Sequence, residues 1–312
     1  MLAVAALVAI FCYFWIQGKA KSKNGPPLPP GPWPLPIVGN LPFLNSDILH
    51  TQFQALTQKH GPLMKIHLGS KLAIVVSSPE MAREVLKTHD ITFANHDLPE
   101  GLVKKMKVHV KKLDLLFDRV MESHVKMVGK KSEDEEDFLQ YLIRVKDDDE
   151  KAPLSLTHVK SLLMDMVLGG VDTSVNASEF AMAEIVSRPE VFKKIRQELD
   201  QVVGKDSIVE ESHLPKLPYL QAVMKETLRL HPTLPLLVPH RNSETSVVAG
   251  YTVPKDSKIF INVWAIHRDP KHWDEPNEFK PERFLENSLD FNGGDFKYLP
   301  FGSGRRICAN YC

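Results

Sequence analysis

The stretch from residue 154 to residue 189 constrains the fold most, because it carries a long helical pattern that is apolar on more than one face. Leu163 and Met166 follow helical spacing, and further apolar residues continue the pattern. Either Ser155 or Thr157 can cap the start of the helix. A helix this long and this apolar is typical of the middle of a helical domain.

The centre of that stretch, GGVDTS, disfavours a straight helix. Gly169 and Gly170 together cost about 2 kcal/mol relative to alanines in a helix interior. The hydroxyls of Thr173 and Ser174 compete for backbone groups. Two interpretations stay open: another helix packs closely against the glycines, or a kink opens a groove beside the Asp172 carboxylate and the Thr173 hydroxyl.

A second helical pattern, YLQAVMKETLRLHP, ends at Pro232 and carries a pair of opposite charges. Glu226 and Arg229 are three residues apart, so they share one face. Such pairs usually lie on the protein surface, where they contribute little to stability. Here the neighbours Val223 and Leu228 are apolar, which predicts a buried pair.

The sequence FGSGRRIC near the C-terminus combines glycines, arginines and a cysteine. Glycine lets the backbone approach a flat partner, because it has no side chain and tolerates positive φ. Arg306 suits a carboxylate, and its charge with backbone N–H groups can hold a thiolate at Cys308. These features favour haem bound by a cysteine. A buried inert cysteine would explain neither the glycines nor the arginine.

Composition narrows the partners and the compartment. The formal net charge is +0, so no basic field indicates a nucleic-acid partner. The three cysteines, Cys12, Cys308 and Cys312, lie near the two ends of the chain. They make a poor disulfide framework and fit a reducing compartment.

The N-terminal residues predict a membrane anchor. Residues 2–16 carry no charge, and Lys19, Lys21 and Lys23 follow them. Because the positive charges come after the apolar run, the downstream chain is expected on the cytosolic side. The run is short for a bilayer span, which takes about 20 residues. We assign residues 1–17 to the anchor and the basic, proline-rich residues 18–40 to a stiff spacer.

A small β-sheet is expected after the spacer. Residues 63–78 alternate and then run apolar, which predicts a hairpin with a buried second strand. Ser78 and Pro79 are typical of a helix start. Residues 248–270 predict two more strands around a turn at 254–256. The fold class is therefore mainly α with a small β-sheet near the N-terminal part.

Four motifs in order carry a family resemblance: GGVDTS, KETLR, KPERF and FGSGRRIC. With the apolar N-terminus and the proline segment, the chain resembles the cytochrome P450 family, and the plant microsomal terpenoid and flavonoid hydroxylases in particular. The resemblance covers nearly the whole chain. It implies haem b as cofactor and monooxygenation of a small hydrophobic plant metabolite with O2. It also implies electrons from NADPH through a membrane-bound reductase, and attachment to lipid of the endoplasmic reticulum.

The resemblance implies roles for the cysteine motif and the central helix. Cys308 matches the axial thiolate ligand of the iron and Phe301 the ring beside it. Gly304 matches the loop glycine, and Arg306 the partner of a haem propionate. The pair Asp172 and Thr173 matches the residues that deliver protons to bound dioxygen, and such proton transfer is general acid work.

The resemblance also implies structural and substrate-binding residues. Glu226, Arg229 and Arg283 match a buried network behind the haem. Either His240 or Arg241 matches a second propionate partner. The residues implied for the substrate pocket are Gly170, Thr233, Leu234, Leu236, Leu237 and Val238.

Two departures from the family pattern limit these expectations. Family members continue after residue 100 with further helices, one of which carries a tryptophan and an arginine that contact haem propionates. The junction Glu100–Gly101 therefore resembles a splice across an internal gap. Asn310 stands where the family has glycine, and the helix that starts at the cysteine is missing. Residues 41–312 are thus expected to be a partial catalytic domain, truncated internally and at the C-terminus.

Two alternatives to a monooxygenase stay open. One is a non-catalytic fragment that binds little haem. The other is a haem-thiolate isomerase or dehydratase of the same fold, which the Asp172–Thr173 pair disfavours because such enzymes do not activate oxygen.

Overall fold

The computed structural model describes residues 25–96, 100–125, 137–148 and 154–308. The chain forms two compact units. Unit 1 comprises residues 1–97 and 176–311, and unit 2 comprises residues 98–175 with the last residue. The predicted anchor, residues 1–17, and the departure at Asn310 lie outside the described residues.

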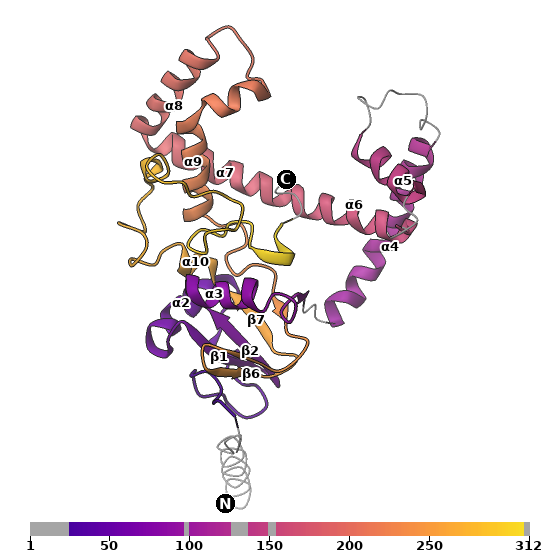
Figure 1. The fold of residues 1–312 in the computed structure, drawn as a ribbon, viewed down its shortest axis with the longest axis vertical. Helices are drawn as coiled ribbons and strands as arrows, with labels where there is room; N and C mark the ends of the chain where they lie inside the picture. The colour runs from indigo at the N-terminus through magenta and orange to yellow at the C-terminus, as the bar shows by residue number, and fades with distance from the viewer. Residues whose placement is uncertain (1–24, 97–99, 126–136, 149–153, 309–312) are drawn as a thin grey trace, which may run out of the picture. The chain divides into compact units, whose positions relative to one another are not determined.

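A five-stranded sheet forms the base of unit 1 (Figure 1). Its strands, in spatial order, are β1 (Leu63–Leu68), β2 (Lys71–Val76), β7 (Lys258–Ile261), β4 (His240–Arg241) and β3 (Asn95–His96). The predicted hairpin is confirmed, because β1 and β2 pair antiparallel. The sheet does not stay near the N-terminal part as expected, since β2 pairs in parallel with β7. A separate ribbon joins β5 (Ser246–Val248) to β6 (Tyr251–Val253).

The buried strand β2 packs on both faces, which explains its unbroken apolar run. Ala73 and Val75 face a cluster that includes Phe53 of α2 (Leu49–His60). Ile74 and Val76 face the opposite cluster with α3 (Pro79–Arg83) and the π-helical turn η3 (Glu84–Thr88). The side chain of Ser78 accepts the hydrogen bond of the Met81 N–H, so the predicted helix cap is confirmed.

The proline-rich segment lies on unit 1 and is not a free spacer from residue 26 onward. Thr252 donates its backbone N–H to the Pro27 carbonyl over 2.8 Å, and Lys65 donates to the Pro30 carbonyl over 2.8 Å. Asn40 then fixes the end of the segment: its amide oxygen accepts from the His67 N–H at 2.8 Å. The predicted spacer was too long, because proline carbonyls can still accept hydrogen bonds from neighbouring strands.

Three helices pack together in unit 1: α8 (Pro189–Val202), α9 (Pro218–Leu230) and the part of α7 (Asp172–Ser187) that follows residue 175. Ile185, Val191 and Val223 belong to their shared cluster. Helix α10 (Val263–Ile266) replaces the end of the second strand predicted for residues 248–270, because Asn262 caps a helical turn there. The short 3-10 helices of the unit are Leu41–Phe43, Ser46–Ile48, Glu211–Lys216, Pro281–Phe284 and Gly304–Arg306.

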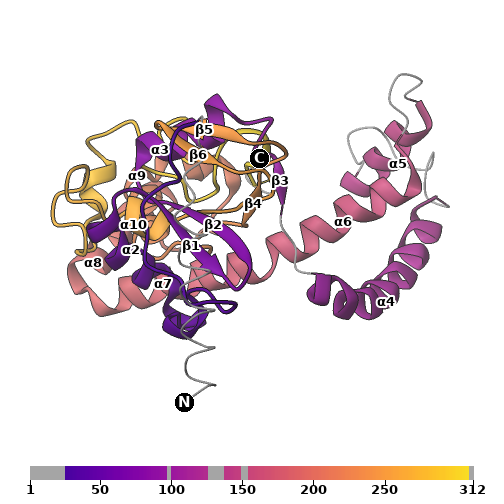
Figure 2. The same ribbon diagram turned by 90° about the horizontal axis from the view of Figure 1, so that it is seen from below.

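Unit 2 contains the helices α4 (Glu100–Val125), α5 (Phe138–Asp148) and α6 (Leu156–Gly170). They come together around a small apolar core (Figure 2). The core residues are Met121, Leu139, Leu142, Ile143 and Val159. Ser155 caps α6 through the His158 N–H, which settles the choice left open by the sequence.

The long central pattern forms two helices that are separated at Val171. Contrary to the expectation of a fully packed central helix, Met166, Leu168 and Met182 are exposed to between 37% and 57%. The small core of unit 2 covers only the face of α6 that carries Val159. Within the described residues, no helix is both long enough and apolar enough to cross a membrane.

Candidate functional site

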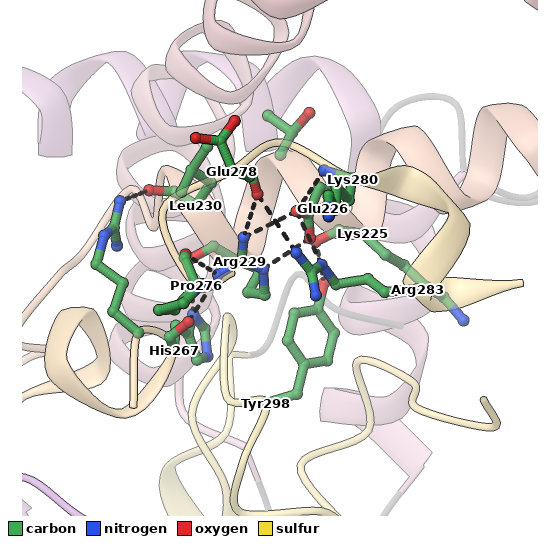
Figure 3. A network of polar contacts seen from close by, with 12 residues as sticks. Lys225, Glu226, Arg229, Leu230, His267, Pro276, Glu278, Lys280, Arg283 and Tyr298 are labelled. Atoms are coloured by element: carbon green, nitrogen blue, oxygen red, sulfur yellow. Dashed lines mark hydrogen bonds and ion pairs between the residues drawn. The ribbon is translucent and has the colours of Figure 1, made fainter. Parts of the chain in front are cut away.

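Arg229 lies at the centre of a buried polar network in unit 1 (Figure 3). It forms a bidentate pair with Glu226 on the same face of α9, over 2.7 and 2.8 Å. The remaining guanidinium N–H groups donate to the carbonyls of His267, Pro276 and Glu278 at 2.7 to 3.0 Å. All five N–H donors of the Arg229 guanidinium therefore have acceptors, and these hydrogen bonds compensate for burying its charge.

The carboxylate of Glu226 joins α9 to the KPERF segment. It accepts the backbone N–H of Lys280 at 2.8 Å and the Nε–H of Arg283 at 3.1 Å. Arg283 donates further to the carbonyl of Asp274 at 2.9 Å. The side chain of Glu226 is fully buried, so the two arginines and the backbone N–H replace its hydration.

His267 extends the network toward the C-terminal loop. Its Nδ1 lies 3.1 Å from the Arg229 carbonyl, and its Nε2 accepts the Leu299 N–H at 2.9 Å. The ring is fully buried, and Tyr298 lies against it with centroids 5.4 Å apart. Burial, with the neighbouring Arg229 charge, lowers the pKa of His267 to about 3.

Residues 299–308, called the cysteine loop, are shaped by two glycines with positive φ. Gly302 has φ +75° and Gly304 has φ +72°. A Cβ on Gly304 would lie 2.2 Å from the Leu86 carbonyl oxygen, so only glycine fits there. The Cys308 N–H closes the loop on the Phe301 carbonyl at 3.0 Å. Cys308 itself is a free, half-buried thiol.

The two arginines of the cysteine loop point to different partners. Arg305 forms an ion pair with Asp90 at 2.7 Å. Arg306 donates from Nε to the Ala94 carbonyl at 2.7 Å. Both contacts link the loop to the segment that follows η3. Because they are largely exposed, each contributes little to the free energy of folding.

Arg306 and the buried His240 line one small hollow in unit 1. His240 is held by its Nδ1 against the Phe93 carbonyl at 2.8 Å. Burial lowers the pKa of His240, and the Arg306 charge acts in the same direction. Arg241 is exposed and lies 3.8 Å from the Asp256 carboxylate. Of the two candidate partners for a second carboxylate, His240 and Arg241, only His240 lies beside Arg306 among the residues that line this hollow.

The segment predicted to line a substrate pocket divides into two kinds of residue. Leu236 and Leu237 pack against the two apolar clusters of the sheet. Leu234 and Val238 are exposed to 44% and 42%. Thr233 is half-buried beside them. Only the exposed part of the segment is available to a ligand in this structure.

Gly170, Asp172 and Thr173 lie in unit 2, whereas the cysteine loop belongs to unit 1. Val171 interrupts the helix between them. The Thr173 hydroxyl donates back to the Gly169 carbonyl, and Asp172 is exposed at the first residue of α7. The helix assignment is thus interrupted at GGVDTS, beside the exposed carboxylate of Asp172 and the half-buried Thr173.

Comparison with known proteins identifies the family. The family model described as Cytochrome P450 matches residues 29–102 and 97–309. The chain belongs to the cytochrome P450 family. Its relatives include salviol synthase of Salvia pomifera, which is 30% identical over 96% of this chain and 85% of that protein. Another is 3,9-dihydroxypterocarpan 6A-monooxygenase of Glycine max, which is 32% identical over 97% of this chain and 86% of that protein.

Solved structures agree on the P450 fold. A zebrafish cytochrome P450 determined with abiraterone has a TM-score of 0.71 at 22% identity. The match covers 84% of this chain and 86% of that chain. The expected mainly helical fold with small sheets is therefore confirmed.

The alignments also show an internal gap relative to other P450 proteins. The match to salviol synthase runs over 429 residues, whereas this chain has 312, so a long internal stretch of the relative has no counterpart here. The family model breaks between residues 97 and 102, beside the junction Glu100–Gly101 at the start of α4.

P450 membership implies a haem cofactor, and the residues present fit one. Gly304 brings the backbone where no Cβ fits, and Cys308 offers a free thiol. Arg306 and His240 line one small hollow together with Asp90, whose carboxylate pairs with Arg305. The sequence analysis missed His267 and Leu299, because their contact joins residues 32 positions apart and no motif signals it.

Proposed function

We propose that this chain is a haem-thiolate monooxygenase that inserts one oxygen atom of O2 into a small hydrophobic plant metabolite. The observation that carries the proposal is the cysteine loop: Gly304 and the free Cys308 thiol occur in a P450 chain whose relatives include a monooxygenase. Electrons come from NADPH through a membrane-bound flavoprotein reductase. Haem bound through a thiolate supplies the iron at which O2 is activated.

The residues of this chain have distinct tasks in that proposal. Cys308 holds the cofactor, and Phe301, whose carbonyl closes the loop, shields the thiolate from water. Arg306, a fixed cation, and His240 beside it are the partners proposed for the cofactor's carboxylates. The hydroxyl of Thr173 holds and passes a proton beside the break between α6 and α7.

Asp172 supplies protons beside the same helix break, because its exposed carboxylate exchanges them with water. Glu226, Arg229 and Arg283 hold α9 and the KPERF segment together. Gly170 leaves room at the end of α6, since it has no side chain. Of the leucine-rich segment, Leu234 and Val238 offer apolar contact to the substrate.

The test of the proposed function uses the full chain with reductase, NADPH, O2 and hydrophobic terpenoids or phenolics. We expect product formation coupled to NADPH consumption, and no product from Cys308→Ser. Haem per chain is measured in the same samples. Product from Cys308→Ser at the rate of the unchanged chain would overturn the proposal.

The internal gap favours a second candidate function, a non-catalytic chain with low haem occupancy. Haem edges left open to water forgo about 25 cal/mol for each Å² of uncovered apolar surface. The exposed Met166 and Leu168 on α6 are the observation behind it. Haem far below one per chain, with full occupancy when the missing segment of a relative is inserted at Glu100–Gly101, would support this candidate.

We also propose that unit 1 contacts lipid through an apolar turn in the proline segment. Leu35 and Gly39 exchange two backbone hydrogen bonds of 2.9 Å, and Ile37 takes φ +68° at the tip. This built turn leaves Ile37 88% and Trp33 74% exposed, in a chain whose uncharged residues 2–16 come shortly before. The side chains of the apolar turn are Trp33, Leu35, Ile37, Val38, Leu41 and Phe43. Such a surface suits the membrane interface.

The lipid contact predicts a local fluorescence change. Vesicles with brominated acyl chains should quench Trp33, measured as the difference between the full chain and Trp33→Phe. Ile37→Asp should reduce that quenching by about half or more, because a charge resists insertion. Ile208→Asp is the matched control, since Ile208 is 86% exposed elsewhere in unit 1. Equal Trp33 fluorescence with brominated and unbrominated vesicles would contradict the proposed lipid contact.

A further inference from the structure

His267 connects the buried charge network to the cysteine loop through hydrogen bonds at both ring nitrogens. On one side Nδ1 meets the Arg229 carbonyl at 3.1 Å, and on the other Nε2 meets the Leu299 N–H at 2.9 Å. The backbone of His267 adds a third link, because its carbonyl accepts from Arg229 Nη1 at 2.8 Å. Figure 3 shows His267 beside Arg229 in this network.

The direction of these hydrogen bonds fixes the chemical form of His267. The Leu299 N–H can only donate, so Nε2 must present its lone pair. The Arg229 carbonyl can only accept, so Nδ1 must carry the proton. The ring is therefore neutral with its proton on Nδ1. Burial and the Arg229 charge lower the pKa of His267, which agrees with that form.

Leu299 is the residue at which the cysteine loop begins. Its N–H is used by His267, and its carbonyl accepts the Gly302 N–H at 3.2 Å. Phe301 follows Leu299 two positions later in the chain, and its carbonyl accepts the Cys308 N–H at 3.0 Å. A shift of Leu299 therefore moves the frame that holds Cys308.

The surroundings leave His267 no alternative position. Its ring is fully buried, and Tyr298 and Trp273 lie against it at 5.4 and 6.5 Å between centroids. The charged groups near it are the guanidiniums of Arg229 and Arg268. Neither can take the place of an acceptor for the Leu299 N–H, because a guanidinium only donates.

We propose that His267 is a positioning residue for the cysteine loop: as a neutral acceptor, it fixes Leu299, and through it Cys308, relative to the Glu226–Arg229 pair. The inference rests on the proposed function only in that the cysteine loop is taken to be the haem-binding loop. The role assigned is alignment of the loop, and no contact of His267 with the cofactor is involved.

The test measures the Cys308 thiol directly, in the haem-free full chain with Cys12→Ser and Cys312→Ser. His267→Phe keeps the ring but removes both hydrogen bonds. We expect Cys308 to react with dithionitrobenzoate about tenfold faster in this variant, the factor that corresponds to one lost hydrogen bond. His267→Gln, which can still accept from Leu299, should restore a rate close to that of the unchanged chain.

His231→Phe is the matched control, because it removes the contact of a different, half-buried histidine with Glu184 at 2.6 Å without touching the cysteine loop. It should lower stability without changing the Cys308 rate. An unchanged Cys308 rate in a folded His267→Phe chain would overturn the proposal and leave His267 a purely structural residue. This readout needs no haem, so absence of haem binding would contradict the proposed function and not this one.

A second measurement decides the matter if His267→Phe does not fold. Hydrogen exchange of the Leu299 amide is followed in the unchanged chain. We expect protection as strong as that of the sheet amides of β2, because the N–H is bonded to a fully buried ring. Exchange as fast as that of an exposed loop amide would overturn the proposal.

Discussion

Replacing Arg229 with alanine is expected to lower the free energy of unfolding by about 3–5 kcal/mol, because it leaves the Glu226 carboxylate buried without its main partner. The pair is fully buried, and its bidentate bonds are 2.7 and 2.8 Å long. The carbonyls of His267 and Pro276 also lose their donor. Urea unfolding followed by circular dichroism measures the loss.

Lys297→Ala is the matched control for that prediction. Lys297 and Asp295 form an exposed pair at 3.4 Å, so its loss should cost less than about 1 kcal/mol. Equal effects of the two substitutions would show that water reaches the Glu226–Arg229 pair and that the network is not buried in solution.

Stability is expected to fall steeply as the pH drops from about 6.5 to 4.5, because the folded chain keeps two histidines, one buried and one half-buried, in neutral form. Burial and nearby arginines lower the pKa of His267 to about 3 and that of His231 to about 4. The unfolded chain therefore binds more protons in this range, so the stability present above pH 6.5 is lost on acidification. Between its pKa in the folded chain and its pKa in the unfolded chain, each histidine contributes about 1.4 kcal/mol per pH unit to the slope of the free energy of unfolding.

Two features of His231 refine the acid prediction. Its Nε2 lies 2.6 Å from the Glu184 carboxylate, a contact that by itself favours a charged ring. Arg188 shares that carboxylate, and burial with Arg268 and Arg188 outweighs the attraction. His231→Phe should therefore reduce the slope of stability against pH by about 1.4 kcal/mol per unit. Unfolding curves at pH 7, 6 and 5 measure it, and an unchanged slope would contradict a neutral His231.

The sequence predicted those parts of the fold that rest on local patterns. The alternation in residues 63–78 gave the β1–β2 hairpin, and Ser78 gave the start of α3. The apolar neighbours of Glu226 and Arg229 predicted that the pair is buried. Each of these depends on residues a few positions apart, where spacing alone determines which side chains share a face.

Contacts between residues far apart in the chain could not be predicted from the sequence. The parallel pairing of β2 with β7 joins residues 73–76 to residues 258–261, and no local pattern signals it. The contact between His267 and Leu299 is of the same kind. The exposure of Met166 and Leu168 on α6 was not predicted, because the apolar spacing along one helix does not show which of its faces another helix covers.

The central claim is that Cys308 is the haem ligand, and the reduced carbon monoxide spectrum tests it most directly. The full chain is reconstituted with haem, reduced and exposed to carbon monoxide, beside Cys308→Ser. We expect the red-shifted Soret band of thiolate ligation in the unchanged chain and its complete loss in Cys308→Ser. The same band in Cys308→Ser would contradict the account, because the ligand would then be Cys12 or Cys312.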